Sequence, residues 1–155
     1  MTPAVEVIRA AEVPHTIHAY EHSSDAASYG MEAVEKLGVP ESRVFKTLVA
    51  KLDGKDLVVA VLPVSATLRM KSLARVAGGK RAEMAQPDEV ERVTGYVLGG
   101  VSPLGQRKLL PTFLDERATH YETIYVSAGK RGLEIELAAS TLQGLTGASI
   151  AAITA

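Results

Sequence analysis

Cysteine is absent from the 155 residues of this chain. Its absence excludes disulfide bonds, thiolate zinc sites and a cysteine nucleophile. A chain without cysteine suits the reducing cytoplasm, and we expect a cytoplasmic protein.

The chain also lacks an excess of one charge, since 17 lysines and arginines face 18 aspartates and glutamates, for a formal net charge of −1. This balance removes the overall basicity that often marks nucleic-acid binders, although a local basic face is compatible with it. The first residues carry Glu6, Arg9 and Glu12 and offer no apolar stretch suited to a secretory signal. The longest uncharged segment, residues 137–155, is too polar for a membrane span, so no membrane association is expected.

The sequence also has no internal repeat, low-complexity tract or linker. Its length and its 46% hydrophobic and 23% charged residues are typical of one globular domain. We therefore predict a single domain over residues 1–155.

Apolar periodicity and turn residues predict several short helices and strands. Asp53-Gly54 lies between two apolar segments and indicates an antiparallel hairpin. Strands outnumber long helices and most connections are too short for repeated βαβ crossovers, so we expect a mixed, largely antiparallel α+β fold. The predicted helices are one starting at Thr2-Pro3, 28–37, 67–77 and one starting at Pro87, and the predicted strands are 15–22, 44–52, the segment after Asp53-Gly54, 82–85, 96–98, 109–114, 123–127 and 132–137.

Lys46 is out of place in its strand, because alternation puts its charge on the face of Val44, Leu48 and Ala50. One interpretation is a cation at the mouth of a core, where it binds a phosphate or a developing oxyanion. The other is a lysine whose stem follows the end of a sheet while its ammonium group stays in water.

Three glycines, a proline and a serine interrupt two strand-like segments in GGVSPLGQ, residues 99–106. Such a loop can direct successive backbone amides into one concavity that binds an anion or oxyanion. Its spacing matches neither a dinucleotide-binding nor a P-loop motif, and an ordinary turn is the alternative.

The four histidines do not form a recognisable metal or triad motif. On a strand, His18 and His22 would stand on the order of 13 Å apart, while His15 faces the other side and His120 is remote in sequence. Ser102 lacks the context of a nucleophile elbow. We therefore expect no metal and no other cofactor.

Five basic residues and no acid lie between positions 69 and 81. This stretch could contact a nucleic-acid backbone or could be a solvated helix face balanced by the acids that follow it. The five residues are Arg69, Lys71, Arg75, Lys80 and Arg81.

Six motifs in this order span nearly the whole chain: TPAV, IHAYEH, VFKTL, LARVAGGKRAEMA, TGYVLGGVSPLGQ and TIYVSAGKRGLEIELA. Together they resemble the YbaK family of bacterial Cys-tRNA(Pro) deacylases, which are relatives of the editing domain inserted in prolyl-tRNA synthetases. The resemblance implies a barrel-like mixed sheet with surrounding helices. It also implies hydrolysis of the ester that joins a wrong amino acid to tRNA.

The resemblance also assigns roles to individual residues. It makes Lys46, Gly99 and Tyr20 the catalytic residues, with Lys46 at the acceptor-end phosphate or terminal ribose. The 99–105 loop would contact the carbonyl region. Glu134 stands where the family usually has Asp, one methylene shorter. The residues expected to bind substrate are Tyr29, Thr47, Gly100, Ser102, Pro103, Gly105 and Glu134.

The implied mechanism needs no protein nucleophile, because the thiol of the misattached cysteine attacks its own carbonyl and forms a thiolactone. An aminoacyl ester is already activated, so positioning and charge stabilisation are enough. The expected partners are aminoacyl-tRNA(Pro) and prolyl-tRNA synthetase. Alternatives are a sister specificity, such as Ala-tRNA(Pro), and a non-catalytic module that binds tRNA or a synthetase.

Overall fold

The computed structural model describes residues 1–23 and 29–155, with the side chain of residue 29 excluded. Five α-helices and two 3-10 helices alternate with short strands in this part of the chain. The helices are α1 Pro3–Ala11, α2 Tyr29–Leu37, η1 Glu41–Arg43, α3 Met70–Val76, α4 Pro87–Thr94, η2 Glu116–His120 and α5 Ala139–Thr146. The strands are β1 Thr16–Ala19, β2 Phe45–Leu52, β3 Asp56–Pro63, β4 Ala82–Met84, β5 Thr112–Asp115, β6 Ile124–Ser127, β7 Leu133–Leu137 and β8 Ser149–Ala151.

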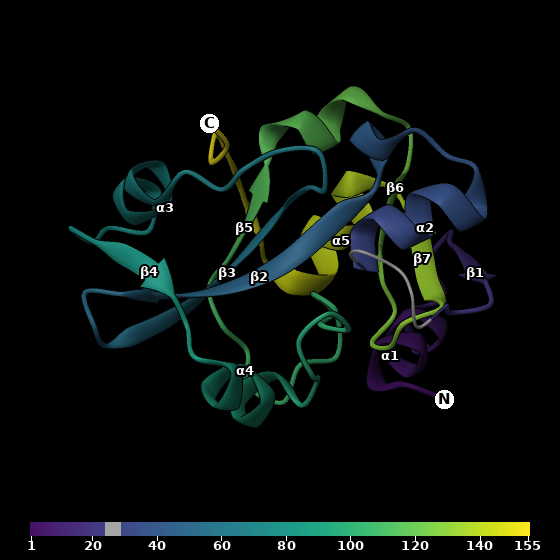
Figure 1. Ribbon diagram of the computed structural model, residues 1–155, viewed down its shortest axis with the longest axis horizontal. Coiled ribbons are helices and arrows are strands. Elements are labelled where there is room, and N and C mark those ends of the chain that lie inside the picture. Colours follow the sequence, from purple (N-terminus) through teal and green to yellow (C-terminus); the bar gives the residue numbers. More distant parts are fainter. Residues whose placement is uncertain (24–28) are drawn as a thin grey trace.

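The strands form two sheets that meet at one point (Figure 1). The larger sheet has the order β4-β2-β3-β5-β8 and the smaller one the order β1-β7-β6. Pairing is parallel between β3 and β5 and between β5 and β8, and antiparallel in the other ladders. A parallel bridge between Val44 and Tyr125 joins the sheets. The expected mixed, largely antiparallel α+β fold is confirmed.

The hairpin of β2 and β3 is formed as predicted, with Leu52 paired to Asp56 across the turn. Asp53 and Gly54 both have positive φ angles, 53° and 69°, which this sharp turn requires. The Asp53 carboxylate also accepts hydrogen bonds from the backbone N–H groups of Lys80 (3.0 Å) and Arg81 (2.9 Å). The hairpin tip is thereby fixed to the segment that leads into β4.

Residues at the helix ends make the capping contacts and turns expected of their residue types. The Thr2 hydroxyl accepts a hydrogen bond from the Val5 N–H (3.2 Å) and caps α1. Gln86 and Glu89 form a capping box at the start of α4. Gly38, with a φ of 65°, follows the end of α2.

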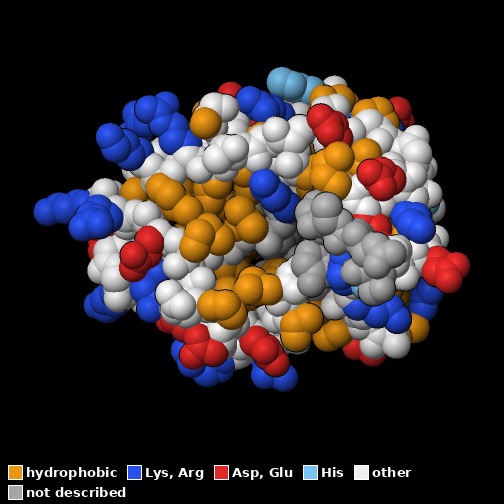
Figure 2. All heavy atoms as spheres, viewed as in Figure 1, with side chains coloured by type: hydrophobic (Ala, Val, Ile, Leu, Met, Phe, Trp, Pro, Cys, Tyr) orange, Lys and Arg blue, Asp and Glu red, His pale blue; other side chains and the backbone are white. Residues whose placement is uncertain are grey.

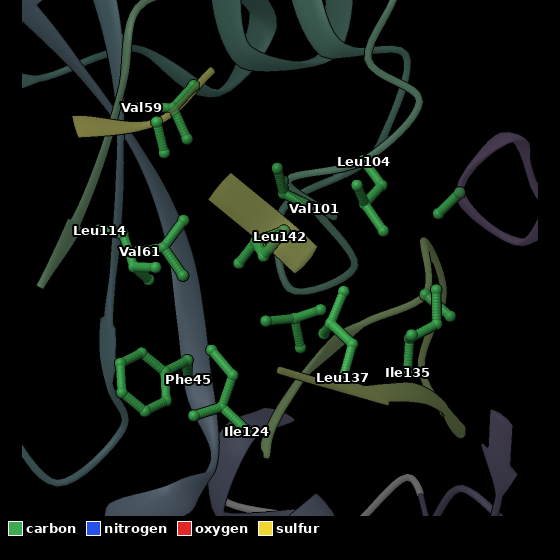
Figure 3. Close-up of a cluster of buried hydrophobic side chains, with 14 of the residues drawn as sticks. Phe45, Val59, Val61, Val101, Leu104, Leu114, Ile124, Ile135, Leu137 and Leu142 are labelled. Atoms are coloured by element: carbon green, nitrogen blue, oxygen red, sulfur yellow. The ribbon is translucent and has the colours of Figure 1, made fainter. Parts of the chain in front are cut away.

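The largest buried cluster lies between the two sheets and is closed by α1, α4 and α5. Figure 3 shows Phe45 and Val61 from the larger sheet packed toward Ile124 and Leu137 from the smaller one. Ile8 is completely buried in the same cluster. The core therefore fixes the two sheets relative to each other and sets the geometry of the gap between them.

Several local predictions differ from the structure. The strand predicted at 96–98 is wrong, because this segment turns and Tyr96 is buried with its hydroxyl donating to the Leu104 carbonyl (2.6 Å). The strand predicted at 15–22 ends at Ala19, and the helix predicted at 67–77 starts at Met70. Helix α5 and strand β8 have no counterpart among the predictions. The predicted helix start at Ser28 lies outside the described residues.

Candidate functional site

A cavity of about 320 Å³ opens beside the first half of β2. Strand β4 pairs only with residues 50–52 of β2, and β6 meets β2 only at the Val44–Tyr125 bridge. No strand in the described part of the chain covers the edge of β2 between these two places, and the cavity occupies this gap. The predicted site residues that line it are Tyr20, Lys46, Thr47, Gly99 and Glu134.

The uncovered edge of β2 directs backbone groups into the cavity. The Val44 carbonyl accepts a hydrogen bond from Val64 on the β3 side (2.8 Å), whereas the Val49 carbonyl accepts one from Ala85 on the β4 side (3.0 Å). Successive residues of an antiparallel strand direct their backbone groups to opposite edges. The backbone N–H and C=O groups of the odd-numbered residues of β2 therefore point away from β3. Those of Thr47 lie at the open edge.

Lys46 projects from the same face of β2 as Val44, which is buried against α2 and β6. Burial lowers the pKa of the Lys46 ammonium group. None of the carboxylates that the structure describes lies within ion-pair distance of it. A partly desolvated cation without a counterion is suited to an anionic or polarised oxygen of a ligand.

Glu134 lies in the middle of β7, in register with His18 on one side and Ser127 on the other. Only 6% of the residue is exposed. Burial raises the pKa of its carboxyl group to about 8. The structure shows no hydrogen bond to this carboxyl group from the residues it describes, so a neutral, unsatisfied acid faces the cavity at pH 7.

Tyr20 and Thr47 add two hydroxyl groups to the cavity wall. The Tyr20 backbone N–H donates to the Gly132 carbonyl (2.9 Å), which holds the residue beside the β6–β7 turn. Burial is the main cause that raises the pKa of its phenol, and the nearby Glu134 adds to it. The Thr47 hydroxyl is buried and has no hydrogen-bond partner within the described residues, so a ligand could satisfy it.

The glycine-rich loop reaches the cavity only at its beginning. Gly99 lines the cavity with a φ of 88°, a backbone conformation that favours glycine. Gly100 is buried beside the β6–β7 turn, where an added Cβ would come 3.3 Å from the Lys130 Cα. Gly99 and Val101 are therefore the residues of this loop that line the cavity.

The rest of the loop, Ser102, Pro103 and Gly105, does not line the cavity. Ser102 is fully buried, and its hydroxyl accepts a hydrogen bond from the Leu104 N–H (3.2 Å). At Gly105 an added Cβ would lie 2.7 Å from the carbonyl carbon of Pro3. These contacts hold the loop against α1, so this half supports the wall from outside the cavity.

Tyr29, which the resemblance assigns to substrate binding, has its side chain outside those that the structure describes. Helix α2 begins at this residue, and the next residue, Gly30, lines the cavity. The backbone at the start of α2 therefore borders the site.

A second carboxylate is buried next to the cavity. Glu32 on α2 is 3% exposed and lies 2.8 Å from His22 Nδ1 and 3.7 Å from an Nη of Arg131, which lines the cavity. Burial opposes ionisation of Glu32, but hydrogen bonds from the Ser23 N–H and His22 outweigh it and lower its pKa. This cluster ties α2 to the β6–β7 turn at the rim of the cavity.

The histidines that could have shared a metal ion lie in separate ion pairs. His22 contacts Glu32, and His18 contacts Glu136 on the outer part of β7 (2.8 Å). Within residues 1–23 and 29–155, no three histidine, aspartate or glutamate side chains lie close enough together to hold a metal ion.

All five basic residues of the stretch are exposed: Arg69 directly precedes α3, Lys71 and Arg75 belong to α3, and Lys80 and Arg81 precede β4. Asp53 lies against the backbone N–H groups of Lys80 and Arg81, which leaves their side chains at the surface. Figure 2 shows lysine and arginine side chains gathered at the end of the molecule where α3 and β4 lie.

Comparison with known sequences now identifies the family. The sequence model of the aminoacyl-tRNA editing domain matches residues 24–145. The chain belongs to this family. Lys46, Gly99 and Glu134 of the cavity lie within the matched residues, and Tyr20 lies before them.

Two related sequences and one solved structure are similar to this chain. EbsC of Enterococcus faecalis, a proposed Cys-tRNA(Pro)/Cys-tRNA(Cys) deacylase, is 40% identical over 153 residues, which are 99% of this chain and 93% of EbsC. A proline–tRNA ligase of Acidithiobacillus ferrooxidans is 30% identical over 87 residues, 56% of this chain and 15% of the ligase. The crystal structure of a proposed trans-editing enzyme for prolyl-tRNA synthetase has the same fold, with a TM-score of 0.85, 23% identity, and coverage of 100% of this chain and 99% of that one.

Sequence reasoning did not find Glu32, His22, Ser127 or Arg131 as parts of the site. Glu32 and Arg131 form an ion pair although they are 99 positions apart in the sequence, and no local sequence pattern predicts such a contact. Ser127 lines the cavity because it is the last residue of β6, beyond the bridge to β2. Only the divergence of these two strands makes it accessible.

No helix in the described ranges is both long and apolar enough to cross a membrane.

Proposed function

We propose that this editing domain is a trans-editing hydrolase that cleaves the aminoacyl ester of mischarged Cys-tRNA(Pro), as a single deacylase domain over residues 1–155. The observation that carries the proposal is a small cavity lined by Lys46, which has no counterion among the described residues, and by the buried carboxyl group of Glu134. The 40% identity to EbsC, over nearly the full length of both chains, supports the same substrate class.

The substrate would lie with its ester at the open edge of β2. The Lys46 ammonium group stabilises negative charge on the terminal ribose, its phosphate or the ester oxygen. The Thr47 N–H, which no other strand engages, donates a hydrogen bond to the carbonyl oxygen, with the backbone at Gly99 on the facing wall. These groups position the ester and lower the cost of charge that develops as it reacts.

The inner end of the cavity suits a small amino acid with an ammonium group. Glu134 is neutral when the cavity is empty, and an incoming ammonium group would favour its ionised form and pair with it. Thr47 and Ser127 supply hydroxyl groups beside it. A cavity of this size leaves little room beyond a small side chain and the ester.

The chemical step uses the substrate's own thiol. Its sulfur attacks the carbonyl carbon, the bond from that carbon to the ribose oxygen breaks, and the thiol proton ends on the ribose oxygen. The products are a thiolactone and free tRNA, so the protein contributes position and charge, not a nucleophile.

Prolyl-tRNA synthetase is the partner that we propose for tRNA selection in the cytoplasm. A small domain with a net charge of −1 offers limited surface for identifying one tRNA among many. The similarity to part of a proline–tRNA ligase fits a function beside that enzyme.

The test is single-turnover deacylation of a matched panel by the purified protein, with and without prolyl-tRNA synthetase. We expect Cys-tRNA(Pro) to be cleaved fastest and Ser-tRNA(Pro) far more slowly, because a hydroxyl group is a poorer nucleophile than a thiol. Equal rates for these two would contradict thiol attack but leave a deacylase. Faster cleavage of Ala-tRNA(Pro) would establish the sister specificity, and no cleavage of any substrate would leave a binding module.

A further inference from the structure

Two large hydrophobic side chains are exposed at the entrance to the cavity. Met84, the last residue of β4, is 44% exposed, and Leu98, in the loop after α4, is 50% exposed. Both also line the cavity, together with the half-buried Leu48. We call these three residues the apolar mouth. Exposed apolar side chains gathered at a cavity are costly to leave in water, which indicates that a ligand covers them.

The apolar mouth and Lys46 lie on one face of the larger sheet. Met84 is in register with Ala50, so it projects from the face of β2 that carries Leu48 and Lys46. Hydrophobic side chains cover this region over β2, β3 and β4 (Figure 2). A ligand that lies on Met84 and Leu48 therefore continues directly to the ammonium group of Lys46.

The charges around the apolar mouth favour an anionic ligand. Glu83 is in register with Lys51, and Lys51 pairs with Glu89 at 2.6 Å, so these acids belong to the opposite face of the sheet. Lys80 and Arg81 precede β4 and are exposed. Arg81 is three residues from Met84 on an extended segment, on the order of 10 Å away. Alternation directs the Arg81 side chain to the face of Glu83, so the cation that a ligand on the apolar mouth meets is Lys46, which lines the same cavity.

We propose that the apolar mouth binds the terminal nucleobase of the aminoacyl-RNA, with the face of the base lying on Met84 and Leu98. This inference rests on the proposed function and names a subsite for the RNA end. A nucleotide combines what the surface needs, because its base has a flat, weakly hydrated face and its backbone is anionic. The ribose and its phosphate then lie toward Lys46.

The contact determines which feature of the base is recognised. Leucine and methionine side chains offer no hydrogen-bonding group to the edge of a base, so they detect the presence of a flat ring and not its identity. We expect another purine to replace the terminal base with little loss. Removal of the base should lose the whole contact.

The experiment pairs protein and RNA changes in single-turnover deacylation of a cysteinyl acceptor-stem microhelix. The proteins are wild type, Met84→Ala, Leu98→Ala, the conservative Met84→Leu and the control Leu109→Ala, which alters an exposed leucine (83%) outside the cavity lining. The RNAs carry a normal or an abasic terminal nucleotide. Enzyme concentration is varied so that half-saturation and maximal rate are measured separately, and thermal melting confirms that each variant is folded.

We expect Met84→Ala and Leu98→Ala each to raise the half-saturation concentration roughly fivefold on the normal RNA, the equivalent of about 1 kcal/mol of apolar contact. The maximal rate of these two variants should change little. Met84→Leu and Leu109→Ala should match wild type in half-saturation concentration. On abasic RNA, Met84→Ala and Leu98→Ala should also have the half-saturation concentration of wild type. An equal loss on both RNAs, or no loss, overturns the subsite while wild-type deacylation still supports the proposed function. Unchanged RNA affinity with weaker binding of prolyl-tRNA synthetase would reassign the surface to a protein partner, and wild-type inactivity on every substrate would reject both proposals.

Discussion

Glu134 and Glu136 stand two residues apart on the same face of β7 and have opposite surroundings. Glu134 is buried without a hydrogen-bond partner among the described residues, and burial raises the pKa of its carboxyl group to about 8. Burial also opposes ionisation of Glu136, but hydrogen bonds from Thr123 and His18, together with the charge of Arg43, outweigh it and lower its pKa. One glutamate is neutral and free for a ligand, and the other is ionised and bound to its own protein.

The difference follows from where each residue lies along the junction of the two sheets. Glu136 is in register with Tyr125, which bridges to β2 at Val44, so Arg43 can reach it (3.4 Å). Glu134 is in register with Ser127, beyond the bridge, where β2 has moved away. Strands β2 and β6 separate between Tyr125 and Ser127. As a result, Glu136 is a structural carboxylate and Glu134 is a candidate ligand-binding one.

The largest effect should come from the cation across the gap from Glu134. Lys46→Ala removes the charge proposed to position the substrate, and we expect single-turnover deacylation to fall by roughly 10²-fold or more with an unchanged melting temperature. The matched control is Lys51→Ala, on the same strand but paired with Glu89 outside the cavity. Near-wild-type turnover by a folded Lys46→Ala protein would defeat this assignment.

Glu134→Gln tests the neutral member of the glutamate pair. The folded protein keeps the Glu134 proton up to about pH 8, whereas in the unfolded chain the carboxyl ionises near 4.5. The folded state therefore binds one more proton between these values, and wild-type stability should fall as pH rises from 5 to 8. The variant should lose this slope, which melting at several pH values will measure, and deacylation should drop roughly tenfold with the lost ammonium partner. An identical pH slope in both proteins would show that Glu134 is not protonated in the folded state.

Glu136→Gln tests the ionised member of the pair. Its effect on the pH dependence of stability should be the opposite of that of Glu134→Gln, and its effect on turnover should be small. Because folding lowers the pKa of the Glu136 carboxyl group, the ionised carboxylate stabilises the fold at pH values above the pKa that this group has in the unfolded chain. This contribution is lost as pH falls through the pKa of Glu136 in the folded protein. At pH 7 we expect a loss of about 1 kcal/mol, because His18 and Arg43 lose a charged acceptor at a partly exposed site. Deacylation should stay within about twofold of wild type. A large loss of turnover in the folded variant would erase the functional contrast between the two glutamates.

The smallest effect concerns binding remote from both glutamates. Lys80→Gln combined with Arg81→Gln should weaken the salt dependence of tRNA binding. The slope of log Kobs against log salt concentration should decrease in magnitude by about one for each phosphate contact removed. The fold should be unaffected, since both side chains are exposed. Arg9→Gln on α1 is the control, and titrations at several salt concentrations supply the slopes. A slope equal to that of wild type would make the basic stretch a solvated face.

Local sequence was sufficient for elements whose residues determine their own conformation. Thr2-Pro3 starts α1, Asp53-Gly54 forms the hairpin and Gly38 ends α2, because capping groups and positive φ angles are properties of a few neighbouring residues. It was insufficient at 96–98, where Tyr96 looks like a strand residue but turns inward to reach the Leu104 carbonyl. Helix α5 was missed because its small and polar residues give little apolar periodicity, and packing of Leu142 in the core stabilises it.

The site divides in the same way. A lysine on an apolar strand face was visible in the sequence, since alternation is a local property, and the order of motifs indicated the family that the comparisons establish. Within the 99–106 loop, in contrast, the sequence treated all residues alike. The structure separates Gly99, in the cavity wall, from Ser102 and Gly105, which pack away from it.

By itself, then, the sequence determined the start of α1, the turn between β2 and β3, the end of α2, the unusual charge of Lys46 and the absence of a cysteine nucleophile, because these depend on residue type and near neighbours. Only the tertiary structure decided which polar groups remain unsatisfied. The segment LEIEL gives Glu134 and Glu136 the same local pattern, and their different ionisation arises from strands that meet at Tyr125 and part at Ser127. Desolvation and pairing depend on distances between residues far apart in the chain, and those distances exist only after the two sheets have packed.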